Sequence, residues 1–153
     1  MFGYFPVPKH LDDALRECGW SPQRRVPTQR WTGQLAKEGF TILPEARQIL
    51  ENFGGLSLIP AGNEAAAFSP GTTVFDPIPV ASGEFDRIDY WQRRLGMKLT
   101  PIADASDIIL LLAEDGRVFG AWCDTLYLWG ASFEEALEVS ILAKENPAEF
   151  ARG

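Results

Sequence analysis

The stretch IILLLAEDGRVFGAW, residues 108–122, decides the fold of this chain. The pair Asp115-Gly116 stands in it between two runs of β-prone apolar residues. Such a pair is a strong signal for a β-hairpin, because aspartate and glycine tolerate the backbone angles of a tight turn. We therefore predict two antiparallel strands joined at Gly116. The run TLYLWG (125–130) predicts a further strand, so that a β-meander forms late in the chain.

Helical patterns surround this meander. Apolar residues recur at helical spacing in several segments, each ended by glycine or begun by a capping residue. The predicted helices cover 11–18 up to Gly19, 29–38 between Thr28 and Gly39, 44–53 from Pro44, 85–95 up to Gly96, and a last segment after Ser132. At this last helix Ser132 and Glu135 fit a capping box, in which Glu135 reaches back to the Ser132 amide.

The segment ENFGGL (51–56) could be a phosphate-binding loop or the end of a helix. A phosphate loop needs its glycines after a strand and before a helix, and here the order is reversed. We therefore interpret Gly54 as a helix stop, at a position where a positive φ favours glycine. The basic pairs Arg24-Arg25 and Arg93-Arg94 are interpreted as surface residues rather than phosphate clamps. TTVF (72–75) predicts a short strand ended by Asp76-Pro77.

These elements predict one α+β domain over residues 1–153, with a largely antiparallel sheet and helices packed mainly on one side. Residues 1–10 are expected to form an N-terminal arm, and 143–153 a C-terminal helix extension or tail. The five tryptophans are expected to pack in or beside the core, with Trp129 the one most readily exposed. Cys18 and Cys123 are expected to be free thiols.

Charge bounds the possible partners. The net charge is −7, and residues 100–153, with ten acidic and three basic side chains, supply all of the excess. Such a surface disfavours nucleic acid and can speed encounter with a basic protein, or it can serve solubility alone. No apolar run is long enough to span a membrane, and the short N-terminal MFGYFPVPKH has no basic start. The sequence predicts a cytoplasmic protein.

The sequence contains few residues that could form a catalytic site. His10 is the only histidine, so histidine-based triads and zinc sites would all have to use it. The carboxylate pairs Asp86/Asp89 and Asp104/Asp107 could in principle serve hydrolysis, which needs two acids in different environments across a cleft. A solvated helix face accounts for Asp86 and Asp89 more simply. We predict no enzyme, metal or cofactor site.

Six motifs in order resemble the SUKH superfamily, and more narrowly its third subfamily, which has a Smi/Knr-like fold. They read CGWSPQRRV, ENFGGL, VFDP, LGMKLTPI, LLLAEDGRVFG and LYLWGASFEEAL, and together they span roughly residues 14–142. The positions interpreted as structural are Trp20, Pro22, Phe53, Gly54, Gly55, Asp76, Pro77, Gly116, Gly130, Ser132 and Glu135. The last helix is expected to run on into AKENPAEF (143–150).

The resemblance implies an immunity protein of a bacterial polymorphic toxin system. Such a protein would bind a cognate toxin, a nuclease or a nucleobase deaminase, and cover its active or substrate-binding face. The expected contacts to a basic toxin face are Asp104, Asp107, Glu114, Asp115, Asp124 and Trp129. The alternatives are a non-enzymatic regulatory scaffold that binds a small ligand or peptide, and a hydrolase that uses acidic residues. A monomer or weak homodimer is expected.

Overall fold

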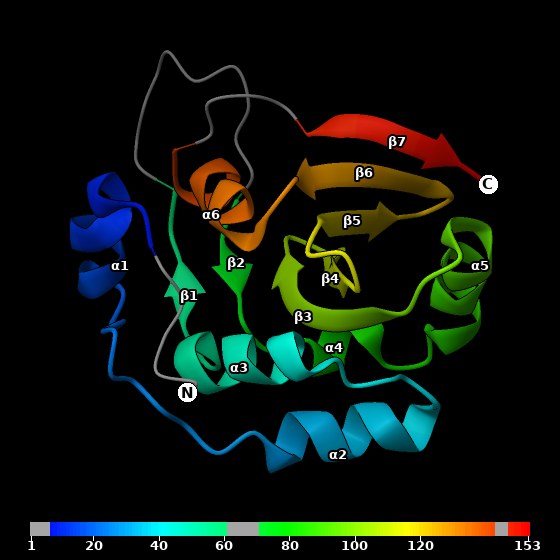
Figure 1. Ribbon diagram of the computed structural model, residues 1–153, viewed down its shortest axis with the longest axis horizontal. Coiled ribbons are helices and arrows are strands. Elements are labelled where there is room, and N and C mark those ends of the chain that lie inside the picture. The colour runs from blue at the N-terminus through cyan, green and yellow to red at the C-terminus, as the bar shows by residue number, and fades with distance from the viewer. Residues whose placement is uncertain (1–6, 61–70, 143–146) are drawn as a thin grey trace.

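The computed structural model describes residues 7–60, 71–142 and 147–153 (Figure 1). Predictions for the N-terminal arm before residue 7, for the loop 61–70 and for residues 143–146 lie outside this part of the chain. Its helices are η1 (Lys9–Leu11), α1 (Asp12–Glu17), α2 (Gln29–Glu38), α3 (Pro44–Phe53), α4 (Ile78–Ala81), α5 (Phe85–Leu95) and α6 (Phe133–Leu142). Its strands are β1 (Ser57–Leu58), β2 (Thr73–Val74), β3 (Leu99–Ala105), β4 (Ile108–Ala113), β5 (Val118–Trp122), β6 (Thr125–Gly130) and β7 (Ala148–Arg152).

The strands form one antiparallel sheet in which each strand pairs with its neighbours in the chain, from β1 to β7. Figure 1 shows this order across the molecule, with α1 at one side of the sheet and α5 at the other. The predicted hairpin is confirmed: Leu112 pairs with Val118 across the turn that contains Gly116, whose φ is +92°. The α+β single-domain arrangement with an antiparallel sheet is confirmed as well.

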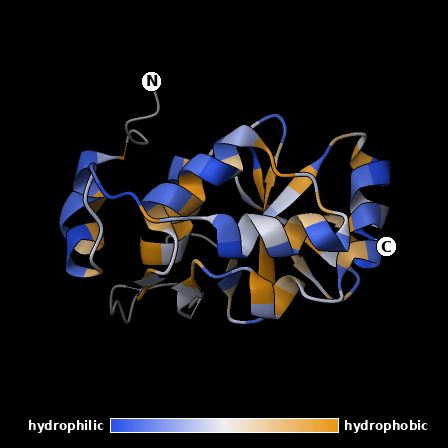
Figure 2. Cartoon of the chain, turned by 90° about the horizontal axis from the view of Figure 1, so that it is seen from below, coloured by the Kyte–Doolittle hydropathy of each residue, from blue (hydrophilic) through white to orange (hydrophobic). Residues whose placement is uncertain are grey.

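Helices lie on both faces of this sheet. Along β4, Ile109 and Leu111 face one core cluster, whereas Leu110 and Leu112 face the other. The first cluster receives side chains from α2, α4 and α5, and the second from α1, α3 and α6. The helices are thus shared between the faces rather than gathered mainly on one. The strands in the middle of the molecule are largely hydrophobic, as a sheet covered on both faces requires (Figure 2).

The predicted helix ends are confirmed at most positions, and the exception is instructive. Gly19, Gly39 and Gly96 follow α1, α2 and α5 with φ of +98°, +109° and +71°. Helix α3 does end at Phe53, but Gly54 has a φ of −53°, so the expected positive φ is wrong. A Cβ on Gly54 would lie 2.3 Å from the Leu50 carbonyl oxygen and 2.5 Å from the Trp31 ring. Close packing, not backbone conformation, therefore requires glycine here.

Other capping predictions are right in position and differ in detail. Thr28 precedes α2, but its side chain makes no capping hydrogen bond. The Ser132 hydroxyl accepts the Glu135 amide at 3.2 Å, as a capping box requires. The Glu135 carboxylate then accepts the amide of Ala131 at 2.7 Å rather than that of Ser132. The side chain thus reaches one residue further back than in a standard capping box.

The C-terminal segment departs from prediction. Residues 148–152 form β7, which pairs with β6 at Leu126↔Ala151 and Thr125↔Arg152, so the expected helix extension or tail is wrong for this segment. The Phe150 ring packs edge-on against Phe119, with ring centroids 5.1 Å apart. This strand forms because it pairs with β6, and no local pattern in its sequence predicts it.

Several motif residues hold the N-terminal half to the sheet. The buried rings of Trp20 and Phe53 stack at 5.9 Å in the core. Asp76 accepts the indole N–H of Trp31 at 3.2 Å and the amide of Ile78 at 3.3 Å. The second bond fixes the start of α4, and the first ties that start to α2. Pro77, which is buried, is the residue immediately before α4.

Candidate functional surface

The acidic residues expected to contact a partner lie at two opposite ends of the sheet. In an antiparallel meander, alternate turns lie at opposite ends. The β3–β4 and β5–β6 turns therefore share one end, which carries Asp107 and Asp124, with Asp104 close by on β3. The β4–β5 turn, which carries Glu114 and Asp115, lies at the other end. The sequence predicted one acidic face, and the fold separates it into two groups.

The two groups also differ in the hydrogen bonds and ion pairs that their carboxylates form within the chain. The Glu114 carboxylate accepts the Lys98 amide at 2.5 Å, and Asp115 forms an ion pair with Arg117 at 2.8 Å. At the other end, Asp104 accepts the Asp107 amide at 2.8 Å, which holds the turn but leaves the Asp107 carboxylate exposed. The Asp124 carboxylate accepts the Thr125 hydroxyl at 3.1 Å and interacts electrostatically with Arg152. Among the described residues, Asp107 therefore offers an exposed carboxylate outside any ion pair, which Asp115 does not.

Trp129 is not available to a partner. It is 2% exposed, and its indole N–H donates to the Ser140 hydroxyl of α6 at 3.3 Å. Its ring lies over Gly120, where a Cβ would come within 2.8 Å of it. The prediction of an exposed Trp129 is wrong because its side chain points to the face that α6 covers. Trp122 is instead the exposed tryptophan, at 49%, directly before the β5–β6 turn.

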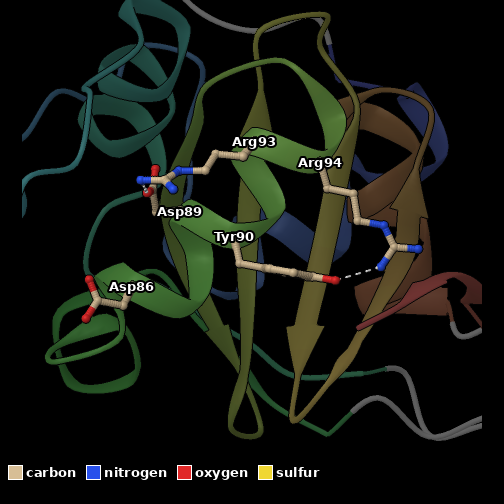
Figure 3. A pocket seen from close by; sticks show the side chains of 5 residues that line it. All are labelled: Asp86, Asp89, Tyr90, Arg93 and Arg94. Carbon is tan, nitrogen blue, oxygen red and sulfur yellow. Dashed lines mark hydrogen bonds and ion pairs between the residues drawn. The ribbon is translucent and has the colours of Figure 1, made fainter.

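A shallow hollow of about 500 Å³ runs along the outer side of α5 (Figure 3). Its lining includes Asp86 and Asp89, the pair considered for hydrolysis. Asp89 is bound to Arg93 at 2.9 Å, and Asp86 lies apart from both (Figure 3). The two acids come from one helix face and do not oppose each other across a cleft. This arrangement is that of a solvated helix surface, and hydrolysis by the pair has no geometric support.

The other side of the same hollow anchors the C-terminal strand. Tyr90 and Arg94 project together away from Arg93 (Figure 3). The Arg94 guanidinium donates to the Tyr90 hydroxyl at 3.1 Å and to the Arg152 carbonyl at 2.6 Å. It also lies 5.3 Å from the Trp91 ring centroid. Arg94 thus joins α5 to β7, which the interpretation of Arg93-Arg94 as a surface pair did not anticipate.

Remaining reactive side chains do not assemble into a centre in the described part of the chain. His10 is exposed and lies 3.8 Å from Glu138, and both cysteines are free, Cys123 exposed and Cys18 partly buried. Within residues 7–60, 71–142 and 147–153, no group of histidine, cysteine, aspartate and glutamate side chains could hold a metal ion. None of the described helices has the length and apolar character needed to cross a membrane.

Comparison with known proteins gives one match. A family model described as SUKH-3 immunity protein matches residues 7–142, nearly the whole chain. No curated protein and no solved structure matches.

Proposed function

The chain belongs to the SUKH-3 immunity protein family, and on this premise we propose that it binds one cognate toxin and covers its active or substrate-binding face. The family match over residues 7–142 is the observation that carries the proposal, since it implies a toxin-neutralising role. The toxin proposed is a nuclease or a nucleobase deaminase with a basic face, and the encounter is proposed to take place in the cytoplasm. Inhibition is by occlusion, without turnover.

The contact surface that we propose is the sheet end formed by the β3–β4 and β5–β6 turns. It combines an exposed tryptophan, Trp122, with the carboxylates of Asp107 and Asp124. Tryptophan is among the residue types that contribute most to binding when buried in an interface. Acidic side chains beside it would steer a basic partner and speed association. The Glu114–Asp115 end, which is engaged within the chain, is a weaker candidate.

Stoichiometry tests the mode of action. The product of a neighbouring toxin gene is purified and its activity is titrated with the full chain. Inhibition by a binding protein is complete at one equivalent and scales with the amount of complex. Complete inhibition far below one equivalent would mean turnover and would contradict the proposal, as would failure of the two proteins to form a complex.

A matched pair of substitutions tests the contact surface. Trp122→Ala should weaken toxin binding by about 2 kcal/mol or more if Trp122 is a central contact. Ile59→Ala is the control, because Ile59 is 68% exposed and follows β1 at the far edge of the sheet. Equal affinities for the wild type and both variants, measured by calorimetry, would place the contact elsewhere.

In the described part of the chain, no comparable observation favours the regulatory-scaffold alternative. A small-ligand regulator needs an apolar pocket with a few convergent polar groups. A second hollow of about 430 Å³ adjoins the first along α5, and its lining includes Arg93, Lys98 and Glu114. Both of these α5 hollows are shallow and rich in charge, which suits neither an apolar ligand nor a buried peptide.

A further inference from the structure

Two arginines from different elements converge on one point of the surface, directly above Gly55. Arg24 lies in the loop between α1 and α2, and Arg30 in the first turn of α2. A Cβ placed on Gly55 would lie 3.8 Å from Nη2 of Arg24 and 3.9 Å from Nη2 of Arg30. Gly55 itself is exposed and has a φ of +86°, so its side of the site is bare backbone.

Both guanidinium groups contact uncharged groups of the protein, a backbone carbonyl oxygen for Arg24 and an aromatic ring for Arg30. Nη1 of Arg24 donates to the Asn52 carbonyl oxygen at 3.1 Å. The Arg30 guanidinium lies 4.3 Å from the centroid of the Trp31 ring, close enough for a cation–π contact. Neither arginine forms an ion pair with a carboxylate among the residues that the structure describes. Two positive charges are therefore held close together, and no carboxylate in the described part of the chain is paired with either.

The position of Arg24 is fixed by contacts with α3. The Asn52 side chain donates to the carbonyl oxygens of Ser21 and Arg24, and the Val26 amide bonds to the Glu51 carbonyl at 2.9 Å. The loop that carries Arg24 is thus tied to the last turn of α3. Partial burial lowers the pKa of Arg24 without the opposing effect of a nearby acid. Arg24 is therefore held in place before any ligand arrives, which reduces the entropic cost of binding.

We propose that Arg24 and Arg30 form a phosphate-binding site over Gly55, separate from the toxin-contact surface and independent of the proposed function. The ligand is a phosphate group with two negative charges, as in inorganic phosphate or a phosphate monoester. Charge complementarity selects it: a doubly charged phosphate near pH 7 matches the two guanidinium groups, whereas a carboxylate or a phosphodiester supplies one charge.

The segment ENFGGL thus has a second use. It ends α3, as the sequence predicts, and Gly55 leaves space for an anion that side chains from elsewhere bind. Arg24 and Arg25 are adjacent in the sequence, but the Arg25 guanidinium donates to the Arg24 carbonyl oxygen at 2.7 Å. The partner of Arg24 in this site is Arg30, six residues on.

Titration of the full chain with inorganic phosphate at constant ionic strength tests the site. Proton–nitrogen NMR spectra should show saturable shifts at the Gly55 amide and at the Nε–H groups of Arg24 and Arg30. Gly83, exposed on the loop after α4, should not respond. Acetate, the single-charge probe, should bind about tenfold more weakly, as expected for the loss of one charge-assisted contact. No saturable shift with phosphate, or equal affinity for acetate, would overturn the proposal.

A substitution localises the effect. Arg30→Gln should weaken phosphate binding by about tenfold or more, and it leaves the contacts of Arg24 with α3 intact. Arg47→Gln, an exposed arginine on α3, is the control with the same change of charge and should bind phosphate as the wild type does. Equal phosphate affinity in Arg30→Gln would overturn the proposal, provided its thermal midpoint equals that of the wild type. Adenosine monophosphate in a parallel titration separates the sources, since tighter binding than inorganic phosphate identifies a monoester ligand.

Discussion

The indole N–H of Trp20 donates to the side-chain oxygen of Asn52 at 2.8 Å, in the interior of the protein. This bond joins the end of the α1 segment to the last turn of α3, and the amide nitrogen of Asn52 completes the link through the Ser21 and Arg24 carbonyl oxygens. Asn52 is 1% exposed, so water could not replace these hydrogen bonds if the Asn52 side chain were removed.

Replacing Asn52 should therefore be costly. Asn52→Ala leaves the Trp20 indole and two carbonyl groups without this partner, and we expect a loss of about 2–4 kcal/mol in the free energy of unfolding. Urea denaturation followed by tryptophan fluorescence measures it. Gln34→Ala, which removes a long and exposed contact to Glu38, should change the stability by less than about 0.5 kcal/mol. Similar values for the two variants would contradict the role assigned to Asn52.

Two glycine-to-alanine substitutions should change the stability of the protein in opposite directions. Gly54→Ala places a methyl group against the Leu50 carbonyl and the Trp31 ring, and we expect a loss of about 1–3 kcal/mol or more. Gly33→Ala, in the exposed face of α2 with nothing within 4 Å, should stabilise the protein by about 0.5–1 kcal/mol. Thermal denaturation of both variants checks the signs. A stable Gly54→Ala would mean that α3 and α2 can separate without cost.

Charge reversal should separate the two ends of the sheet. Replacing Asp104, Asp107 and Asp124 together by lysine should slow toxin association and reduce its dependence on salt, because these acids would steer a basic partner. Replacing Glu114 and Asp115 should slow association less, since the backbone amide of Lys98 and the guanidinium of Arg117 already bind them. Stopped-flow kinetics at several salt concentrations gives both rates. Unchanged association in both variants would exclude acidic steering.

Removing the anchor of β7 should loosen the C-terminus. Arg94→Ala loses the bond to the Arg152 carbonyl, a contribution of about 1 kcal/mol, so amide exchange in β7 should accelerate several-fold. Arg93→Ala is the matched control, because Arg93 is 82% exposed in its side chain and binds Asp89 on its own helix. Hydrogen exchange measured by mass spectrometry compares the two. Equal protection of β7 in both variants would show that β6 alone holds this strand.

The sequence predicts the features of this fold that arise from nearby residues. The Asp115-Gly116 turn and the helix ends at Gly19, Gly39 and Gly96 depend on local backbone preferences, which is why they are confirmed. Coverage of both sheet faces could also have been predicted, because the run 108–113 is apolar at every position rather than at alternate ones.

Tertiary structure decides the rest. Which of Trp122 and Trp129 is exposed depends on where α6 lies, and the strand at 148–152 exists because β6 offers it an edge. The separation of the acids follows from the alternation of turns in a meander. The convergence of Arg24 and Arg30 on Gly55 depends on three segments that only the folded chain brings together.

The order of strands in the sheet has a consequence for biosynthesis. Each strand pairs with its sequence neighbours, and the connections from β3 to β6 are short turns, so this central part of the sheet forms from local contacts, which favour rapid folding. The helices α1 to α3, however, leave the ribosome before the central strands that they cover. Their apolar sides cannot be buried against the sheet until the central strands have emerged, and apolar surface exposed in this interval favours aggregation.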